Sequence, residues 1–111
     1  MRRNRMDLPH IVNMYFDADS RNDADALVKT LAVDAVVEDE NARHQGAVAI
    51  RDWWVAAKKA TQYRAEPVES AVDGDKALVR ARVSGQFPGS PVMLTHAFTI
   101  KDDRIVRLEI L

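Results

Sequence analysis

The sequence predicts an α+β domain in which helical segments come first and a mostly antiparallel sheet follows. Three observations predict this class. Apolar residues follow helical spacing in the first third of the chain, strict alternation begins at Tyr63, and Asp73-Gly74 is a strong hairpin signal between two alternating runs. Helices followed by hairpin-linked strands are typical of α+β folds. The 111 residues have the size of one domain, which we expect over residues 1–111.

The first helix is predicted by an amphipathic stripe. Its members recur at helical spacing and are Leu8, Ile11, Val12, Tyr15 and Phe16. Asp7 can cap this helix, and Pro9 is tolerated in its first turn. The stripe is therefore expected to face an apolar interior.

Three further elements are predicted before the sheet. Asp23 can cap a short second helix that carries Leu27, Val28 and Leu31. Residues 35–39 contain the β-branched Val36 and Val37 and predict a first strand, whereas the polar residues 41–46 predict a loop. A third helix is expected over residues 47–60, with one face made by Ile50, Trp53, Trp54 and Ala57.

The rest of the chain predicts hairpin-linked strands. One strand alternates cleanly, with an apolar face made by Ala77, Val79, Ala81 and Val83. A turn at residues 88–91 leads to a strand over 92–100, and a turn at 101–103 leads to a last strand over 104–111.

Composition excludes several classes of function. The formal net charge is −1, so no long-range field favours nucleic acid or an anionic membrane. The chain has no cysteine, which excludes disulfides, thiolate metal sites and cysteine nucleophiles. No apolar run approaches the ~20 residues of a membrane span, and no signal peptide follows the basic start, so we expect a cytoplasmic protein. A domain this small buries a modest share of its surface alone, so we expect a homodimer.

Tyr15 and Asp39 are the first candidates for chemistry. Tyr15 lies in the apolar stripe, so its hydroxyl needs a buried partner or a ligand. Asp39 shares a strand face with Val37, and partial burial would raise its pKa and make it a usable general base. The alternatives are a core tyrosine bonded to a backbone carbonyl and a solvated aspartate at the end of a strand.

The remaining candidates are aromatic. Trp53 and Trp54 could each form the floor of a pocket, but they point about 100° apart, and we favour Trp54. His10, His44 and His96 have no second ligand at metal spacing, so no metal site is predicted. Serine-nucleophile motifs, phosphate-binding glycine loops and dinucleotide fingerprints are missing from the sequence.

Four segments, at residues 12–16, 21–25, 31–39 and 46–51, resemble the nuclear transport factor 2-like superfamily. Within it, the chain is most similar to the ketosteroid isomerases and the SnoaL-like polyketide cyclases. The resemblance implies a cone-shaped barrel: three N-terminal helices packed on a strongly curved, mostly antiparallel sheet that is open at one end. It also implies that Asp39 shuttles a proton between carbons of an enolisable ketone while Tyr15 donates a hydrogen bond to the enolate oxygen.

The chain departs from the isomerases at other positions. Thr95, followed by His96, stands where the second oxyanion acid is expected, and alternation leaves open which of the two faces the pocket. Leu31 and Trp54 replace the supporting tyrosines.

The leading hypothesis is a SnoaL-like or ketosteroid isomerase-like enzyme that moves a proton on a small, largely apolar carbonyl compound. Asp39 is the base, Tyr15 the oxyanion donor, and Thr95 or His96 an auxiliary donor; neither a metal nor an organic cofactor is needed. The candidates for shaping the pocket are Met14, Trp53, Trp54, Val79, Val83 and Met93.

Two alternatives use the same fold. A non-catalytic ligand-binding or dimerisation module predicts a solvated Asp39 with an ordinary pKa and a cavity filled by side chains such as Trp54. Epoxide hydrolysis needs an Asp–Arg–Asp set, which outward-facing Arg80 and Arg82 do not favour. These two arginines, with Arg107 and Glu109, are expected on an outer sheet face that could pair across a two-fold axis.

Overall fold

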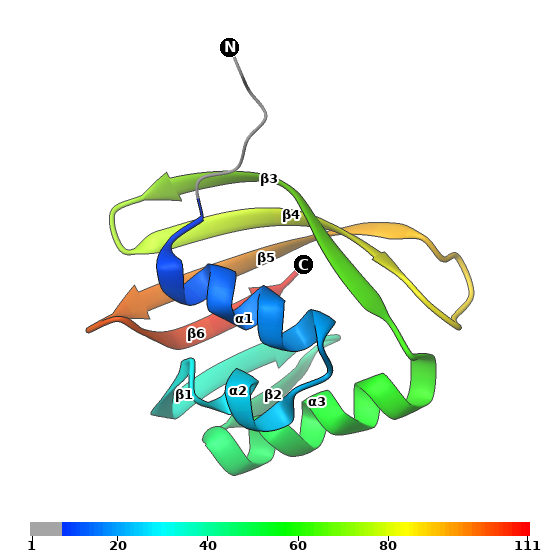
Figure 1. The fold of residues 1–111 in the computed structure, drawn as a ribbon, viewed down its shortest axis with the longest axis horizontal. Coiled ribbons are helices and arrows are strands. Elements are labelled where there is room, and N and C mark those ends of the chain that lie inside the picture. Colours follow the sequence, from blue (N-terminus) through cyan, green and yellow to red (C-terminus); the bar gives the residue numbers. More distant parts are fainter. Residues whose placement is uncertain (1–7) are drawn as a thin grey trace.

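Residues 8–111 are described in a computed structural model, and they form three helices and six strands (Figure 1). The elements run in the order α1 (His10–Ser20), α2 (Ala24–Val28), β1 (Leu31–Asp39), β2 (Ala42–Gln45), α3 (Ala47–Thr61), β3 (Arg64–Asp73), β4 (Lys76–Ser84), β5 (Val92–Lys101) and β6 (Arg104–Ile110). The predicted α+β class is confirmed. Two strands separate α2 from α3, however, so the helices do not form one N-terminal block.

The helices form where the predicted stripes and caps lie. α1 buries Ile11, Val12, Tyr15 and Phe16, and it begins after Pro9; the predicted cap Asp7 lies outside the described residues. Asp23 caps α2 as predicted, because its side chain accepts a hydrogen bond of 3.0 Å from the backbone N–H of Ala26. Two faces of α3 contact other elements, since α3 packs on both α2 and β1.

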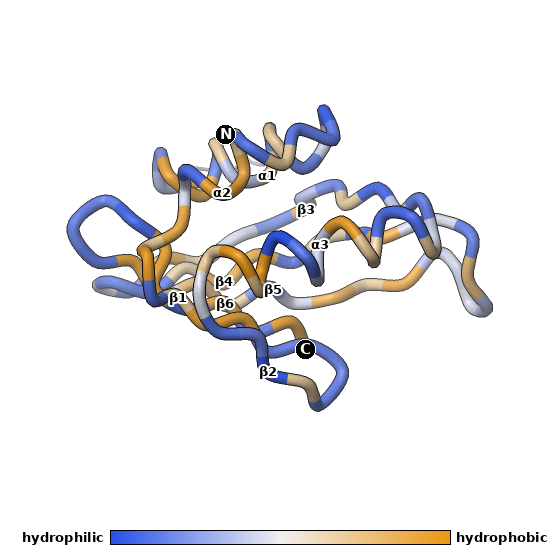
Figure 2. Tube along the Cα trace, turned by 90° about the horizontal axis from the view of Figure 1, so that it is seen from below, coloured by the Kyte–Doolittle hydropathy of each residue, from blue (hydrophilic) through white to orange (hydrophobic). Residues whose placement is uncertain are grey.

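The strands of the sheet are ordered β2-β1-β6-β5-β4-β3. Neighbouring strands are antiparallel except β1 and β6, which pair in parallel with Val37 opposite Leu108. β3 and β4 form the hairpin predicted at Asp73-Gly74. Seen at right angles, α1 and α2 lie on one side of the sheet, and hydrophobic segments follow β1 and β6 (Figure 2).

Two sequence predictions between α2 and α3 are wrong. Residues 42–45 form the edge strand β2 and not a loop; they are mostly exposed, so they lack the apolar alternation that marks a strand. Leu31 begins β1 and does not belong to the second helix. β1 is irregular between Leu31 and Val36, which hides its period of two.

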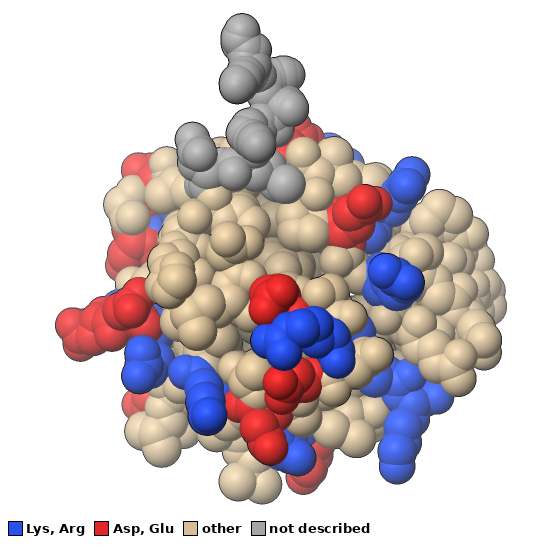
Figure 3. Space-filling view, viewed as in Figure 1, with Lys and Arg blue, Asp and Glu red and all other residues tan. Residues whose placement is uncertain are grey.

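The core lies between the helices and the inner face of the sheet. The predicted alternation on β4 is confirmed, because its odd-numbered residues from Ala77 to Val83 are buried and its even-numbered residues from Lys76 to Arg82 are exposed. Acidic and basic side chains lie next to one another on the molecular face in Figure 3. Among the ion pairs of the described residues, Arg21 pairs with both Asp17 and Asp23. Within residues 8–111, no helix is long and apolar enough to cross a membrane.

Candidate active site

A cavity of about 460 Å³ opens between α1, α3 and the inner face of the sheet. Its polar lining consists of Tyr15, Asp19, Asp39, Glu40, Thr61, Tyr63 and His96. Its apolar lining consists of Phe16, Trp53, Ala57, Ala65, Val83, Phe87, Pro88, Val92, Leu94 and Ile110. Cavities of this size hold small organic ligands, and a few converging polar groups orient them.

Asp39 lies at the end of β1 and is half-buried at the cavity. Burial raises the pKa of its carboxyl from the usual 3.8, and the nearby charge of Glu40 adds to this effect. Two neighbours lower the pKa of Asp39 and oppose this increase. The indole Nε1 of Trp53 donates a hydrogen bond of 3.3 Å to Asp39 Oδ2, and His44 acts electrostatically. The carboxyl is therefore a stronger base than a solvated aspartate.

Tyr15 is buried on the inner face of α1, with only 3% of its surface exposed. Its ring packs edge-to-face against Phe16 and Phe98, with 5.4 Å between ring centres in each pair. Burial raises the pKa of its phenol well above 10.0, and the charges of Asp19 and Asp39 raise it further. The hydroxyl therefore stays protonated near neutral pH and can donate a hydrogen bond.

Asp19, which sequence analysis missed, is the centre of a buried polar cluster. Its Oδ1 accepts hydrogen bonds from Trp54 Nε1 at 2.8 Å and from the Tyr63 hydroxyl at 2.7 Å. The ammonium of Lys58 lies 3.5 Å from the same oxygen and donates to the backbone carbonyls of Asp19 and Tyr63. Asp19 follows Tyr15 by four residues, so a carboxylate in the apolar stripe was the signal that could have revealed it.

His96, and not Thr95, faces the cavity. His96 pairs with the inward-facing Val79 across the β4–β5 ladder, whereas Thr95 pairs with the outward-facing Arg80. Desolvation lowers the pKa of His96 to about 4, against opposing effects of Asp19 and of the Leu94 backbone, so its imidazole is neutral at physiological pH. Its Nδ1 is buried and has no hydrogen-bond partner within residues 8–111.

Several predicted cavity residues lie elsewhere. Trp53 lines the cavity, whereas Trp54 is not among the lining residues and its indole donates a hydrogen bond to Asp19 Oδ1. Val79 is fully buried in the core, Met14 lies on the outward side of α1, and Met93 lies on the outer face of β5; the two methionines are 41% and 42% exposed. Of the predicted apolar lining, Val83 and Trp53 contribute to the cavity.

A model of the SnoaL-like domain matches residues 12–108. The chain belongs to the SnoaL-like family. A proposed polyketide cyclase from Sinorhizobium meliloti is 77% identical, with a TM-score of 0.93 over 94% of this chain and 95% of that one. No curated protein matches the sequence.

More distant structures share the fold of this SnoaL-like domain. A protein with a ketosteroid isomerase-like fold from Catenulispora acidiphila, solved in complex with trimethylamine, is 19% identical, with a TM-score of 0.80 over 95% of this chain and 86% of that one. A nuclear transport factor 2-like protein of unknown function from Cytophaga hutchinsonii is 9% identical, with a TM-score of 0.80 over 99% and 93%.

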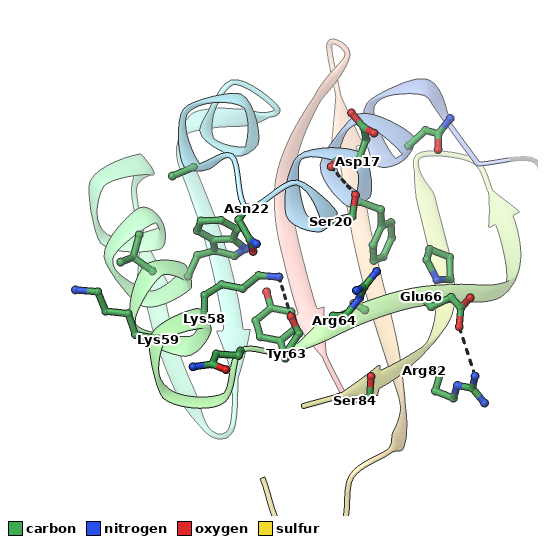
Figure 4. A pocket seen from close by; sticks show the side chains of 18 of the residues that line it. Asp17, Ser20, Asn22, Lys58, Lys59, Tyr63, Arg64, Glu66, Arg82 and Ser84 are labelled. Atoms are coloured by element: carbon green, nitrogen blue, oxygen red, sulfur yellow. Dashed lines mark hydrogen bonds and ion pairs between the residues drawn. The ribbon is translucent and has the colours of Figure 1, made fainter. Parts of the chain in front are cut away.

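A second, more open hollow adjoins the SnoaL-like cavity between α1, α3 and β3 (Figure 4). Most of its lining residues are polar or charged; the labelled side chains include Lys58, Lys59, Arg64, Glu66 and Arg82, and Glu66 pairs with Arg82. Tyr63 lines both hollows, and the Lys58 ammonium lies 3.9 Å from the centre of its ring. The cluster around Asp19 thus lies where the two hollows meet.

Proposed function

We propose that this protein is an acid/base enzyme that moves a proton between carbons of a small, largely apolar carbonyl compound. One observation carries the proposal: a single cavity is lined by the carboxyl of Asp39, whose pKa is raised, and by the buried Tyr15, whose phenol stays protonated. The similarity to a proposed polyketide cyclase adds support, since cyclisation of a polyketide is carbonyl chemistry.

Each residue has a defined role in this reaction. The Asp39 carboxylate takes a proton from the carbon next to the carbonyl, and the electron pair of the broken C–H bond forms an enolate. Tyr15 donates a hydrogen bond to the enolate oxygen, where the negative charge develops. The protonated Asp39 then returns the proton to a carbon of the enolate, which restores the carbonyl. A base with a raised pKa serves this reaction because its conjugate acid holds the proton more firmly between the two steps.

His96 is the auxiliary donor in the proposal. It is neutral and lines the same cavity, so one ring N–H can reach a ligand oxygen without the cost of burying a charge. Thr95, the other candidate at this place, lies on the outer face of β5 and is not part of the proposed site.

Replacement of Asp39 by Asn tests the proposal. We expect proton abstraction to fall by about 10²–10⁴-fold, because the amide cannot accept the proton, while ligand binding and stability change little. Deuterium uptake from D2O at the carbon next to the carbonyl, followed by NMR over a panel of enolisable ketones, measures this step without a known product. Met14→Leu, on the outward side of α1, is the control and should exchange at the wild-type rate.

Two results would contradict the proposal. Unchanged exchange in Asp39→Asn would remove Asp39 as the base. Ketones that bind to the wild-type protein without any exchange would instead assign the cavity to a non-catalytic ligand-binding or dimerisation module.

A further inference from the structure

Two unpartnered polar atoms belong to residues that line the cavity: Asp19, which the proposed proton transfer does not use, and His96, which it uses only as an auxiliary donor. Asp19 Oδ2 and His96 Nδ1 are buried side-chain atoms without a hydrogen-bond partner within residues 8–111. Asp19 is 1% exposed and His96 5% exposed, and both residues line the cavity. A buried polar atom without a partner costs free energy, so such atoms in a cavity indicate where a ligand or a water molecule binds.

The two oxygens of Asp19 have different environments. Oδ1 accepts from Trp54 and Tyr63 and lies beside the Lys58 ammonium. These three groups come from α3 and from Tyr63, just before β3, and they hold the carboxylate in one orientation. Oδ2 is therefore a fixed acceptor in the wall of the cavity, and it has no hydrogen-bond partner among residues 8–111.

The charges around Asp19 favour a neutral donor over a cation. The Lys58 ammonium already balances the carboxylate, so a second ammonium would add little attraction and would lose its own hydration. The side chain of Lys58 is only 12% exposed, so it is not easily displaced. A hydroxyl has the chemistry that both unpartnered atoms need, because it can donate to Asp19 Oδ2 and accept from a ring N–H of His96.

We propose that Asp19 and His96 form a hydroxyl-binding subsite, so that the cavity selects carbonyl compounds that also carry a phenolic or alcoholic hydroxyl. The inference rests on the proposed function in that it assigns the substrate class of the same cavity. The subsite is distinct from Asp39, whose Oδ2 accepts from Trp53 and which lies at the end of β1.

The subsite can be tested by the binding of two probes that have no carbonyl group, so that no turnover takes place. 2-Naphthol carries the hydroxyl, and 2-fluoronaphthalene has a similar shape but no donor. We expect the wild-type protein to bind 2-naphthol at least about tenfold more tightly in equilibrium dialysis at pH 7, because a hydrogen bond to a charged group has this strength. Equal affinities, or no binding of either probe, would overturn the subsite, since water would then satisfy the two atoms.

Three variants locate the hydroxyl. In Asp19→Asn, the amide oxygen can still accept from Trp54 and Tyr63 while Oδ2 is replaced by a donor, so the preference for 2-naphthol should disappear. His96→Phe keeps an aromatic ring between Phe16 and Phe98 and should weaken the preference several-fold. If Asp19→Asn fails to fold, His96→Phe still tests the hydroxyl-binding subsite. Asp39→Ala should keep the preference.

If the preference for 2-naphthol is lost in Asp39→Ala and kept in the Asp19 and His96 variants, the hydroxyl binds beside Asp39, and the proposed subsite is overturned. The outcome is separate from that of the deuterium-exchange experiment. Exchange that depends on Asp39, without a preference for 2-naphthol, would keep the proposed reaction and remove the subsite. A preference that depends on Asp19, without exchange, would keep the subsite and remove the reaction.

Discussion

Two tryptophans that are adjacent in the sequence bind two different carboxylates. The indole of Trp53 donates to Asp39, and the indole of Trp54 donates to Asp19. Successive residues of a helix point about 100° apart, so one turn of α3 reaches both the cavity and the buried cluster. The pair therefore positions two acidic groups with opposite tasks: a base that must exchange a proton and an acceptor that must stay fixed.

Replacement of Trp53 by Phe should raise the pKa of Asp39 further. The indole hydrogen bond stabilises the charged carboxylate, so its loss favours the protonated form, while the aromatic ring still keeps water away. A carboxyl-carbon NMR titration of Asp39 measures the shift. Replacement of the exposed Val48, near the start of α3, by Ala should leave the titration unchanged. A lower pKa in Trp53→Phe would show that another group holds the carboxylate.

His96 should make stability depend on pH between about 6.5 and 4. Its folded pKa is lowered from 6.5 to about 4, so within this window the unfolded chain binds a proton that the folded protein does not. The free energy of unfolding therefore falls as the pH decreases, by about 3 kcal/mol over the whole window. His96→Phe should remove this component, and urea denaturation of both proteins at a series of pH values measures it. If the free energy of unfolding depends on pH in the same way in both proteins, His96 is not the group responsible.

Sequence reasoning reached some residues of the site and missed others for a physical reason. Tyr15 and Asp39 could be selected because a stripe and a strand face define their directions. His96 could not be separated from Thr95 until the register of β4 against β5 was known, since a shift of one residue exchanges the two faces. Asp19 was overlooked because acidic residues near the end of a helix are usually solvated, and its partners are 35 and 44 residues away.

At the scale of elements, the strands that alternate were predicted well and the edge strand was not. β4 has one buried and one exposed face, so its pattern was plain. β2 is exposed at the edge of the sheet, and only its pairing to β1 makes it a strand. The turn between β1 and β2 contains Glu40 and Asn41, which have positive φ angles of 52° and 63° and form a tight hairpin. The dipeptide Glu-Asn is a weaker sequence signal for such a hairpin than Asn-Gly.

The segment after β4 lies close to the junction of α3 and β3. Gly85 has no side chain, and an added Cβ would lie 2.8 Å from the carbonyl oxygen of Thr61 and 2.9 Å from Cα of Tyr63. Thr61 and Tyr63 both line the cavity, so the missing side chain allows the segment to close against the cavity wall.

Gly85→Ala should therefore destabilise the protein by about 1–3 kcal/mol, because the backbone must move to admit the methyl group. Chemical denaturation measures the loss, and the affinity for 2-naphthol should fall with it as Tyr63 shifts. The exposed neighbour Gln86, replaced by Ala, is the control and should stay within about 0.5 kcal/mol of wild type. A Gly85→Ala protein as stable as wild type would show that the junction adjusts freely.

At the scale of the molecule, the charged outer face of the sheet is already paired within the chain. Arg80 lies near Glu69 and Arg82 near Glu66 across β3 and β4, and Arg107 pairs with Glu38 and Glu109. These arginines are thus poor candidates for pairing across a two-fold axis or for epoxide chemistry. Apolar Leu78 and Met93 share this face and are 47% and 42% exposed.

We propose that two copies associate through this outer face and bury Leu78 and Met93. Light scattering after size exclusion should then give about twice the chain mass of 12.5 kDa. The double change Leu78→Lys and Met93→Lys should produce monomers, because a lysine on each copy would be desolvated at the interface. Val48→Lys, on the exposed face of α3, should leave the mass unchanged. A wild-type mass of one chain at micromolar concentration would contradict the dimer.

The place of β6 in the sheet has a consequence for synthesis. This strand, residues 104–110, lies between β1 and β5, so it joins the first strand of the chain to the meander of β3, β4 and β5. In a nascent chain that lacks residues 104–110, no strand joins the β1–β2 pair to the meander of β3, β4 and β5. Residues 104–110 must leave the ribosome before the central ladder can form, so the sides of β1 and β5 that β6 pairs with stay unpaired until then.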